Sequence, residues 1–493
     1  MVSVTDESVH NAYISNSSIT ITQGNLEVLS RANVSITANA QAVSGGVVSG
    51  TGAKASIVFK PTVVASVTGN VNQATGDIKV NATVYIEKLN AVTNGAAVGA
   101  GVSIGASVAT ITVSHDIKAY IGAGTITTGG KVFVTALYNR GESDTDGGNI
   151  SASAFAGAGA LVGATGANAD IEHKGAVRAY ITGQTLNSDK GVFVNAFGYH
   201  NLTANGDGIG GGAAAIGSVV VSVNDNQSTY EAYINNSRTN ITQSGNVEIL
   251  SHITVNITVK AKATTGGIIS GSSTDASISF KPVIRAYLAG NVEQANGDIK
   301  INATLFIKGL SAVSEGAAAG GVNIGDFIAK VTVSPDMASY IGTGTVNTNG
   351  SIYVEVYYNL DDNVSIFAGA YAGSGSLIGN ATGAKAEIVH EGTFKAYITG
   401  QVIDSRKDIV VRALGYQKLN GYTGGLNIAG LVAKGAAVVS ITNKPAFEAY
   451  VENSNITAAG SVLINAVRTG RIDAVAKGTN GGLVNAGVAK VLP

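Results

Sequence analysis

Eight tyrosines recur at nearly constant spacing along this chain, and a ninth position in the series holds Ser66. Consecutive positions are separated by 53, 54, 60, 53, 54, 53, 57 and 53 residues, and each tyrosine lies in a phrase such as AYI, AYL or SYI. The tyrosines are Tyr13, Tyr120, Tyr180, Tyr233, Tyr287, Tyr340, Tyr397 and Tyr450. A fixed period of about 50 residues is typical of a stacked repeat protein. The spacing therefore predicts one elongated array rather than a single globular core.

The repeat also has a second, longer level. Tyr13 and Tyr233 are 220 residues apart, and the segment 69–86 (GNVNQATGDIKVNATVYI) returns as GNVEQANGDIKINATLFI at 290–307. We therefore predict an all-β, elongated β-solenoid of about nine ~55-residue units, arranged as a ~220-residue super-repeat of four units. The array is expected to be continuous over 1–493, with units at approximately 12–64, 65–118, 119–178, 179–231, 232–285, 286–338, 339–395, 396–448 and 449–493 (the last incomplete), and super-repeats at about 12–231 and 232–448.

Apolar and polar residues alternate strictly within each unit. From Val247 to Ala263 every second residue is apolar or small, and the residues between them are mostly polar. Period two over 17 residues indicates a half-buried β-strand. A second alternating run places Ala53, Ala55, Ile57 and Phe59 on one face, and we find no convincing 3.6-residue pattern. Successive coils are expected to stack about 4.8 Å apart, with either one or two coils in each unit.

Glycine- and alanine-rich segments lie between the alternating strands. The segment 95–113 has 19 residues without a charge and would satisfy a hydropathy criterion for a membrane span. Its glycines and β-branched residues disfavour helix, and related segments recur in every unit. We therefore expect no transmembrane span, and we interpret the small side chains as allowing two sheets to pack closely in a thin core.

Composition excludes several classes of function. The net charge is −1 and only 13% of residues are charged, about half the usual share, so nothing favours nucleic-acid binding. The absence of cysteine excludes thiolate zinc sites, iron–sulfur clusters and disulfides. The sequence begins and ends within a repeat unit, so we expect a fragment of a longer array whose export signal lies outside it.

The sequence gives little support to catalysis. It contains no GxSxG or HExxH motif, and of the six histidines only His173 and His390 occupy equivalent positions in the two super-repeats. We interpret the histidines as surface residues and predict no enzyme and no cofactor. Paired carboxylates from different coils, as in stacked-coil polysaccharide lyases, leave an enzyme as an alternative. The histidines are His10, His115, His173, His200, His252 and His390.

One acidic loop is a weak candidate for calcium. Glu142, Asp144, Asp146 and Asn149 could supply the oxygen ligands that Ca²⁺ prefers. Their spacing differs from the EF-hand loop and from the GGxGxDxUx repeat of calcium-binding β-rolls. We favour a solvated acidic loop and predict no metal.

The tyrosine series and the N-x-S/T sequences each have two interpretations. The rings either stack from coil to coil as a structural ladder, which we favour, or form an exposed row that binds sugar. The N-x-S/T sites either belong to polar outward rows or are glycosylated in a host that modifies secreted proteins. They include Asn16, Asn33, Asn81, Asn240, Asn256, Asn302 and Asn455.

The segment 95–136, GAAVGAGVSIGASVATITVSHDIKAYIGAGTITTGGKVFVTA, resembles the repeats of large bacterial exoproteins. These are the filamentous haemagglutinin and leukotoxin-like adhesins, exported by two-partner or autotransporter routes. The resemblance covers essentially the whole chain and rests on a Gly/Ala run, an alternating strand, AYI and GxVxVxA. It implies a β-solenoid passenger at the cell surface that contacts host cells, other bacteria or matrix. No functional residue is transferred, because the shared motif is structural.

These patterns lead to a ranked set of functions. We expect an extracellular or cell-surface protein, the shaft of a large adhesin, whose partners are cell-surface or matrix components. The alternative is a filament, sheath or surface-layer subunit that joins its own copies end to end, because uncapped solenoid ends present unpaired strands. A membrane-active toxin and a polysaccharide-active enzyme rank lower.

Overall fold

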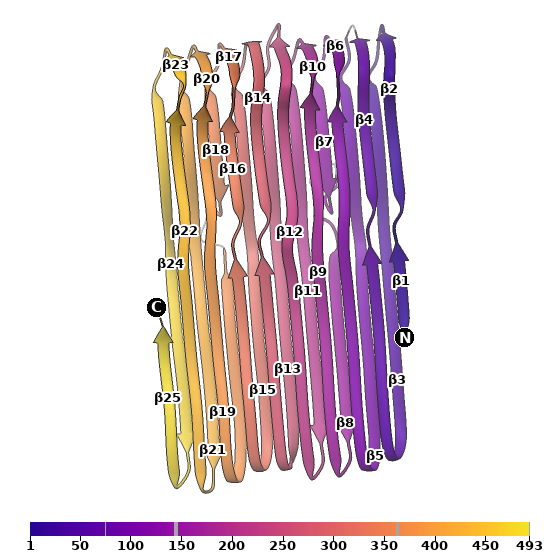
Figure 1. The fold of residues 1–493 in the computed structure, drawn as a ribbon, viewed down its shortest axis with the longest axis vertical. Coiled ribbons are helices and arrows are strands. Elements are labelled where there is room, and N and C mark those ends of the chain that lie inside the picture. The colour runs from indigo at the N-terminus through magenta and orange to yellow at the C-terminus, as the bar shows by residue number, and fades with distance from the viewer. Residues whose placement is uncertain (74, 142–145, 361–363, 493) are drawn as a thin grey trace.

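The chain folds into a single stack of parallel β-coils. A computed structural model describes residues 1–73, 75–141, 146–360 and 364–492. Within these residues every pairing between strands is parallel and no helix is present, so the predicted all-β solenoid is confirmed. Figure 1 shows the strands side by side from the N-terminal coil to the C-terminal coil.

The strands are β1 (Val2–Asp6), β2 (Val9–Ile21), β3 (Leu26–Phe59), β4 (Thr62–Gln73), β5 (Ile78–Ile121), β6 (Gly124–Thr128), β7 (Val132–Tyr138), β8 (Asn149–Gly159), β9 (Val162–Thr182), β10 (Gln184–Ser188), β11 (Val192–Gly211), β12 (Ala214–Ile241), β13 (Val247–Phe280), β14 (Val283–Ala295), β15 (Ile299–Val333), β16 (Asp336–Ile341), β17 (Gly344–Thr348), β18 (Ile352–Tyr358), β19 (Ile366–Thr399), β20 (Gln401–Ser405), β21 (Ile409–Ala429), β22 (Val432–Glu452), β23 (Asn455–Ala458), β24 (Val462–Gly481) and β25 (Val484–Leu492).

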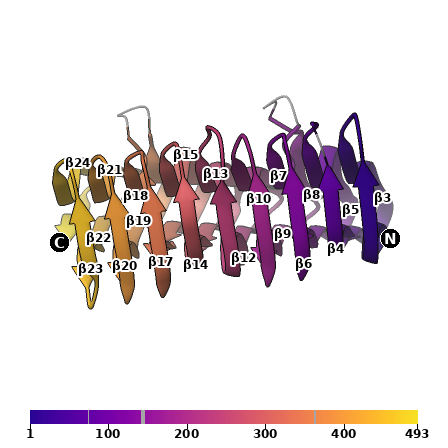
Figure 2. The ribbon, with the colours of Figure 1, turned by 90° about the horizontal axis from the view of Figure 1, so that it is seen from above.

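One repeat unit makes one coil. Tyr180 pairs with Tyr233, Tyr233 with Tyr287, and Tyr287 with Tyr340, so equivalent residues of consecutive units are direct neighbours. The sequence left open one or two coils per unit, and this register gives one. The nine positions of the tyrosine series therefore rise by roughly 40 Å along the axis at the usual strand spacing. Figure 2 shows the same succession of coils seen from above.

Each coil is a flattened loop with two long faces. In β3 the chain runs down one face over residues 26–46, turns at glycine, and returns over residues 48–59 toward β4. We call these the front face and the return face. The turn is tight enough that hydrogen bonding between coils continues through it, which is why β3, β5, β13 and β15 are 34 to 44 residues long.

The core lies between the two faces. On the front face of β13 the residues from Val247 to Ala263 that were predicted to share one side are all buried, which confirms the period-two pattern. The AYI phrase follows the same rule: Ala179 and Ile181 point into the core, whereas Tyr180 lies on the outer surface. Rows of identical or similar side chains from neighbouring coils thus pack on one another.

The coil tapers where the glycine–alanine segments turn. A Cβ atom at Gly95 would lie 2.4 Å from the carbonyl oxygen of Ala106 on the opposite face. At Gly105 it would lie 2.2 Å from the carbonyl oxygen of Gly157. Glycine is thus required for close approach of backbones rather than for flexibility. Among the residues that the structure describes, no helix is long and apolar enough to cross a membrane.

Candidate functional site

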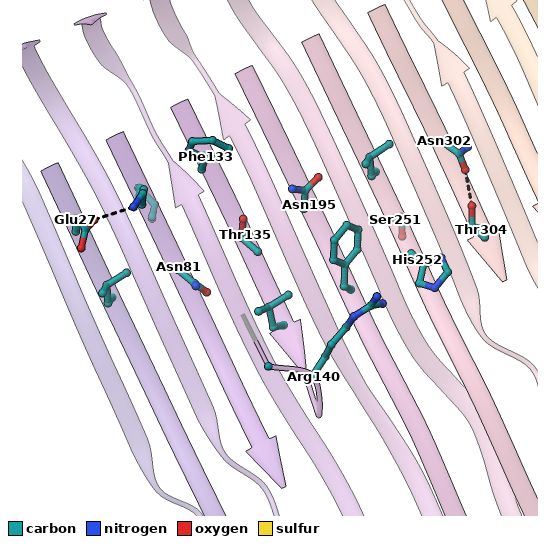
Figure 3. Close-up of a pocket in the computed structure, with 17 residues that line it drawn as sticks. Glu27, Asn81, Phe133, Thr135, Arg140, Asn195, Ser251, His252, Asn302 and Thr304 are labelled. Carbon is teal, nitrogen blue, oxygen red and sulfur yellow. Dashed lines mark hydrogen bonds and ion pairs between the residues drawn. The ribbon is translucent and has the colours of Figure 1, made fainter. Parts of the chain in front are cut away.

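The front face bears a groove across six coils. It has a volume of about 700 Å³, which is within the range of small-ligand sites. Arg140, which follows β7, extends across it toward His252 (Figure 3). The lining residues are Glu27, Leu29, Lys79, Val80, Asn81, Phe133, Thr135, Leu137, Arg140, Gly141, Asn195, Phe197, Leu250, Ser251, His252, Asn302 and Thr304.

Aromatic and amide side chains project into the groove from the strands that form it. Phe133 stacks on Phe193 with ring centroids 5.0 Å apart, and the Arg140 guanidinium lies 5.3 Å from the Phe197 ring. Asn81 and Asn195 are both in register with the intervening Thr135, so they are two coils, roughly 10 Å, apart. Ring edges and amide groups at these spacings can contact the apolar parts and the hydroxyls of a polyhydroxylated ligand.

The structure describes two of the four candidate residues of the acidic loop. Glu142 and Asp144 lie outside the described residues. Asp146 forms an antiparallel bridge with Arg140, and its carboxylate lies 2.6 Å from Lys308 Nζ. Asn149 is in β8 and accepts a hydrogen bond from Thr203 Oγ1 at 3.4 Å. The structure does not test the prediction that this loop binds no metal; both described candidate residues have protein partners.

The N-x-S/T asparagines lie outside the core. All seven are exposed or half-buried, as an outward row requires. Asn81 and Asn302 line the groove, and each accepts a hydrogen bond from the threonine two residues later, at 2.9 and 2.6 Å. A glycan on either asparagine would fill the groove, so glycosylation there and ligand binding are mutually exclusive.

Seven of the eight tyrosines of the series form a continuous stack on the return face. Neighbouring rings from Tyr120 to Tyr450 have centroids 4.7 to 5.0 Å apart and lie within 3 to 5° of parallel. Tyr13 is separated from this stack by Ser66, which occupies the intervening coil. The rings lie face to face, so their faces contact one another and only their edges are available to a ligand. This geometry favours the structural interpretation.

The stack is expected to give the protein a distinctive alkaline titration. Burial, followed by the neighbouring phenols, raises the pKa of Tyr180 and of Tyr397 to about 12. The folded state therefore favours the neutral phenols, because their pKa lies above the unfolded value of about 10. The stability that the neutral phenols contribute is complete below pH 10 and is lost as the pH rises toward 12. Phenolate absorbance should therefore show a late-titrating group of tyrosines, smaller in Tyr287→Phe. Simultaneous ionisation of all tyrosines near pH 10 in folded protein would contradict this.

Four histidines that we predicted to be on the surface are buried, so that interpretation is wrong for His115, His173, His200 and His390. His252 is half-buried on the outer face, whereas His10 is half-buried on the inward side of the first coil. The alternation itself contained the missing signal. His173 is two residues after the inward-facing Ile171, and Asp225 is two residues after the inward-facing Val223.

Three of the buried groups converge on one point between adjacent coils. Asp225 Oδ2 lies 3.3 Å from His173 Nδ1 and 2.7 Å from His200 Nδ1. The opposite ring nitrogens are hydrogen-bonded to tyrosine hydroxyls, with His173 Nε2 2.9 Å from Tyr138 and His200 Nε2 2.7 Å from Tyr230. We call these five residues the buried cluster.

The environment of the buried cluster fixes its protonation. Burial acts to raise the pKa of Asp225, but the adjacent imidazoles outweigh it and hold that pKa well below its usual range. Burial lowers the pKa of His200, and it raises the pKa values of Tyr138 and Tyr230. Ser228 Oγ donates a hydrogen bond to Asp225 Oδ1. The two histidines and Ser228 thus favour the ionised form of the Asp225 carboxylate.

The second super-repeat has a simpler version of the same arrangement. Tyr358 and His390 replace Tyr138 and His173 and keep the hydrogen bond, with Tyr358 OH 2.7 Å from His390 Nε2. Asn443 takes the place of Asp225, and its Oδ1 lies 3.1 Å from His390 Nδ1. Gln417 occupies the position of His200, and Phe447 that of Tyr230. The second arrangement is thus uncharged.

An apolar ridge follows the narrow edge of the solenoid. Every coil exposes at least two large aliphatic side chains at its glycine–alanine turn. Backbone groups in these turns are hydrogen-bonded between coils, for example Ala214 N to Leu161 O at 2.9 Å. The ridge comprises Val47, Val48, Val98, Val102, Leu161, Val162, Ile209, Ile216, Ile268, Ile269, Val322, Ile324, Leu377, Ile378, Leu431, Val432, Leu483 and Val484.

Comparison with known proteins gave no assignment. No protein-family model, curated protein or solved structure matches the chain. The functional argument therefore depends on the geometry described above.

Proposed function

We propose that the protein is an extracellular structural and adhesive protein, the shaft of a large surface or secreted adhesin. The observation that best supports this is the aromatic- and amide-lined groove on a rigid, continuous front face. A stack of coils holds such rows at fixed spacing over a long surface, as attachment to an extended partner requires. The resemblance to filamentous haemagglutinin and leukotoxin-like exoproteins, which rests on sequence pattern, points to the same function.

The groove chemistry favours cell-surface or matrix glycans as the partner. The edges of the Phe133 and Phe197 rings offer apolar contact to sugar rings, while Asn81, Asn195 and Asn302 offer donors and acceptors to hydroxyls. Few charges line the groove, which suits a neutral ligand. Its only carboxylate among the described lining residues, Glu27, pairs with Lys79 at 3.0 Å. A glycosidase site would need a second carboxylate.

A binding assay tests this proposal. Purified protein should bind cells or a glycan array, and Phe197→Ala together with Asn195→Ala should weaken binding at least about tenfold, as loss of a central contact does. Tyr353→Ala is the matched control, because Tyr353 lies on the same face but outside the groove. Equal binding by the groove variant and the control would exclude the groove as the attachment site. Degradation products in a glycan screen would instead support the enzyme.

Electron microscopy distinguishes the shaft from the alternative of a self-assembling filament, sheath or surface-layer subunit. A shaft should appear as isolated rods, whereas end-to-end joining should give fibres of indefinite length. A concentration series separates the two without any variant, because end-to-end joining lengthens with concentration.

The apolar ridge favours a second candidate, contact with a membrane. Its turns are free of charge over residues 95–113, 208–224 and 263–274. Hydrogen bonding between coils satisfies the turn backbone, as an apolar environment demands. Release of dye from neutral liposomes, reduced by Ile268→Ser with Ile269→Ser, would support membrane activity.

A further inference from the structure

We propose that His173, His200 and Asp225 form a buried binding site for a divalent transition-metal ion of the zinc class. Two imidazole nitrogens and one carboxylate oxygen are donors that such ions prefer. Each residue comes from a different strand, β9, β11 and β12, so stacking of adjacent coils assembles the site. The site is independent of the groove and of the proposed adhesive function.

The spacing of the three ligand atoms can accommodate a metal ion after a small adjustment. The three ligand atoms lie within 4.8 Å of one another. Four ligands around zinc at about 2.0–2.1 Å are separated by roughly 3.3 Å. The His173 Nδ1–Asp225 Oδ2 distance of 3.3 Å matches this separation. The His200 Nδ1–Asp225 Oδ2 distance of 2.7 Å is shorter and would lengthen when a metal binds. Neither pair forms a hydrogen bond of ordinary geometry, so these three buried atoms face one another without linear N–H···O bonds.

The groups around the three residues have the arrangement of an outer shell. Metal-bound histidines usually hydrogen-bond through their other ring nitrogen, which fixes the tautomer and the ring orientation. Here Tyr138 and Tyr230 occupy both Nε2 atoms. Each Nδ1 therefore remains the nitrogen directed at the shared point. Ser228 in turn holds the second oxygen of Asp225.

The burial of Asp225 gives a second argument. Asp225 has no exposed surface, and no lysine or arginine is paired with it among the described residues. Buried carboxylates in proteins are usually paired with a positive group or coordinate a metal. A divalent cation bound between the carboxylate and the two imidazoles would meet that requirement. The second super-repeat needs none, because Asn443 replaces the carboxylate.

The experiment compares the whole chain with a variant designed from its own second super-repeat. The protein is unfolded in chelator, refolded with Zn²⁺ or Co²⁺, and freed of excess metal. We expect on the order of one ion per chain, visible d–d absorption for Co²⁺ and a higher Tm than for metal-free protein. The double variant His200→Gln, Asp225→Asn should fold, because Gln417 and Asn443 occupy these positions in the second super-repeat, and should bind less than about a tenth of an ion.

A second variant and an X-ray absorption spectrum test the same site independently of the double variant. His390→Gln changes the uncharged counterpart and should leave one ion per chain. Should the double variant fail to fold, X-ray absorption on the wild-type Co²⁺ protein must still show nitrogen and oxygen ligands from histidine and carboxylate. Wild-type protein that refolds without retaining Zn²⁺ or Co²⁺ would overturn the proposal, as would equal metal content in the double variant.

Discussion

Replacing Gly95 by valine is expected to destabilise the coil that contains it by about 3 kcal/mol, the upper end of the usual cost of overpacking. The first atom of the new side chain would lie 2.4 Å from the carbonyl oxygen of Ala106 and 2.9 Å from Ser107 Oγ. Because Ala106 presents backbone, no rotamer change relieves the clash, and the two faces must separate. Denaturant unfolding should show a lower midpoint, and hydrogen exchange should show faster opening around residues 95–113.

Gly166 provides the matched control. It lies on the return face of β9, and a Cβ atom there would meet nothing within 4 Å. Gly166→Val should change stability by less than about 0.5 kcal/mol, because valine suits a strand and the site is open. Hydrogen exchange is needed beside the bulk measurement, since repeat arrays open locally. A Gly95→Val protein with the midpoint of Gly166→Val would show that the tapered edge is not closely packed.

The sequence was sufficient to predict most of the fold because the repeat and the alternation act together. Spacing of the tyrosines identified the equivalent positions, and period two identified the inward side of each strand. Both follow from the physics of a parallel stack, in which residue i of one coil contacts its equivalent in the next. The same pattern could not fix the number of coils per unit, because that depends on whether the glycine turn reverses the chain once or twice.

The candidate sites were harder to predict for two physical reasons. The groove consists of outward residues such as Phe197 and Asn195, which a strand pattern assigns only to the surface. The buried cluster was missed because histidine was assumed to be exposed, as polar residues usually are. His200 and Asp225 lie on opposite faces of one coil and meet across its core, and stacking adds His173 from the neighbouring coil. The alternation assigns every second residue of a strand to the core. Applying this rule to polar residues as strictly as to apolar ones would have placed His200 and Asp225 inside.

Acid is expected to destabilise the second super-repeat through His390. This side chain has no exposed surface, and burial lowers its pKa to about 4 despite its contact with Asn443. One ring nitrogen contacts the Tyr358 hydroxyl and the other contacts Asn443 Oδ1. Water therefore cannot solvate the positive charge that protonation of His390 would add. The folded state therefore favours neutral His390, because its pKa lies below the unfolded value of about 6.5. The stability that neutral His390 contributes is complete above pH 6.5. It is lost as the pH falls toward 4, by about 3 kcal/mol in total.

Urea unfolding at pH 7.5 and pH 4 checks this expectation when wild type is compared with His390→Gln. The variant keeps a polar side chain in the core, as the buried Gln417 does in the next coil, but cannot take up a proton. It should be less stable than wild type at pH 7.5 and should lose less stability on acidification. The other buried titrating groups act equally in both proteins, so the difference isolates His390. His252→Gln, on the outer face, should keep the full wild-type loss, and parallel pH profiles for wild type and His390→Gln would show that His390 is already charged in the folded coil.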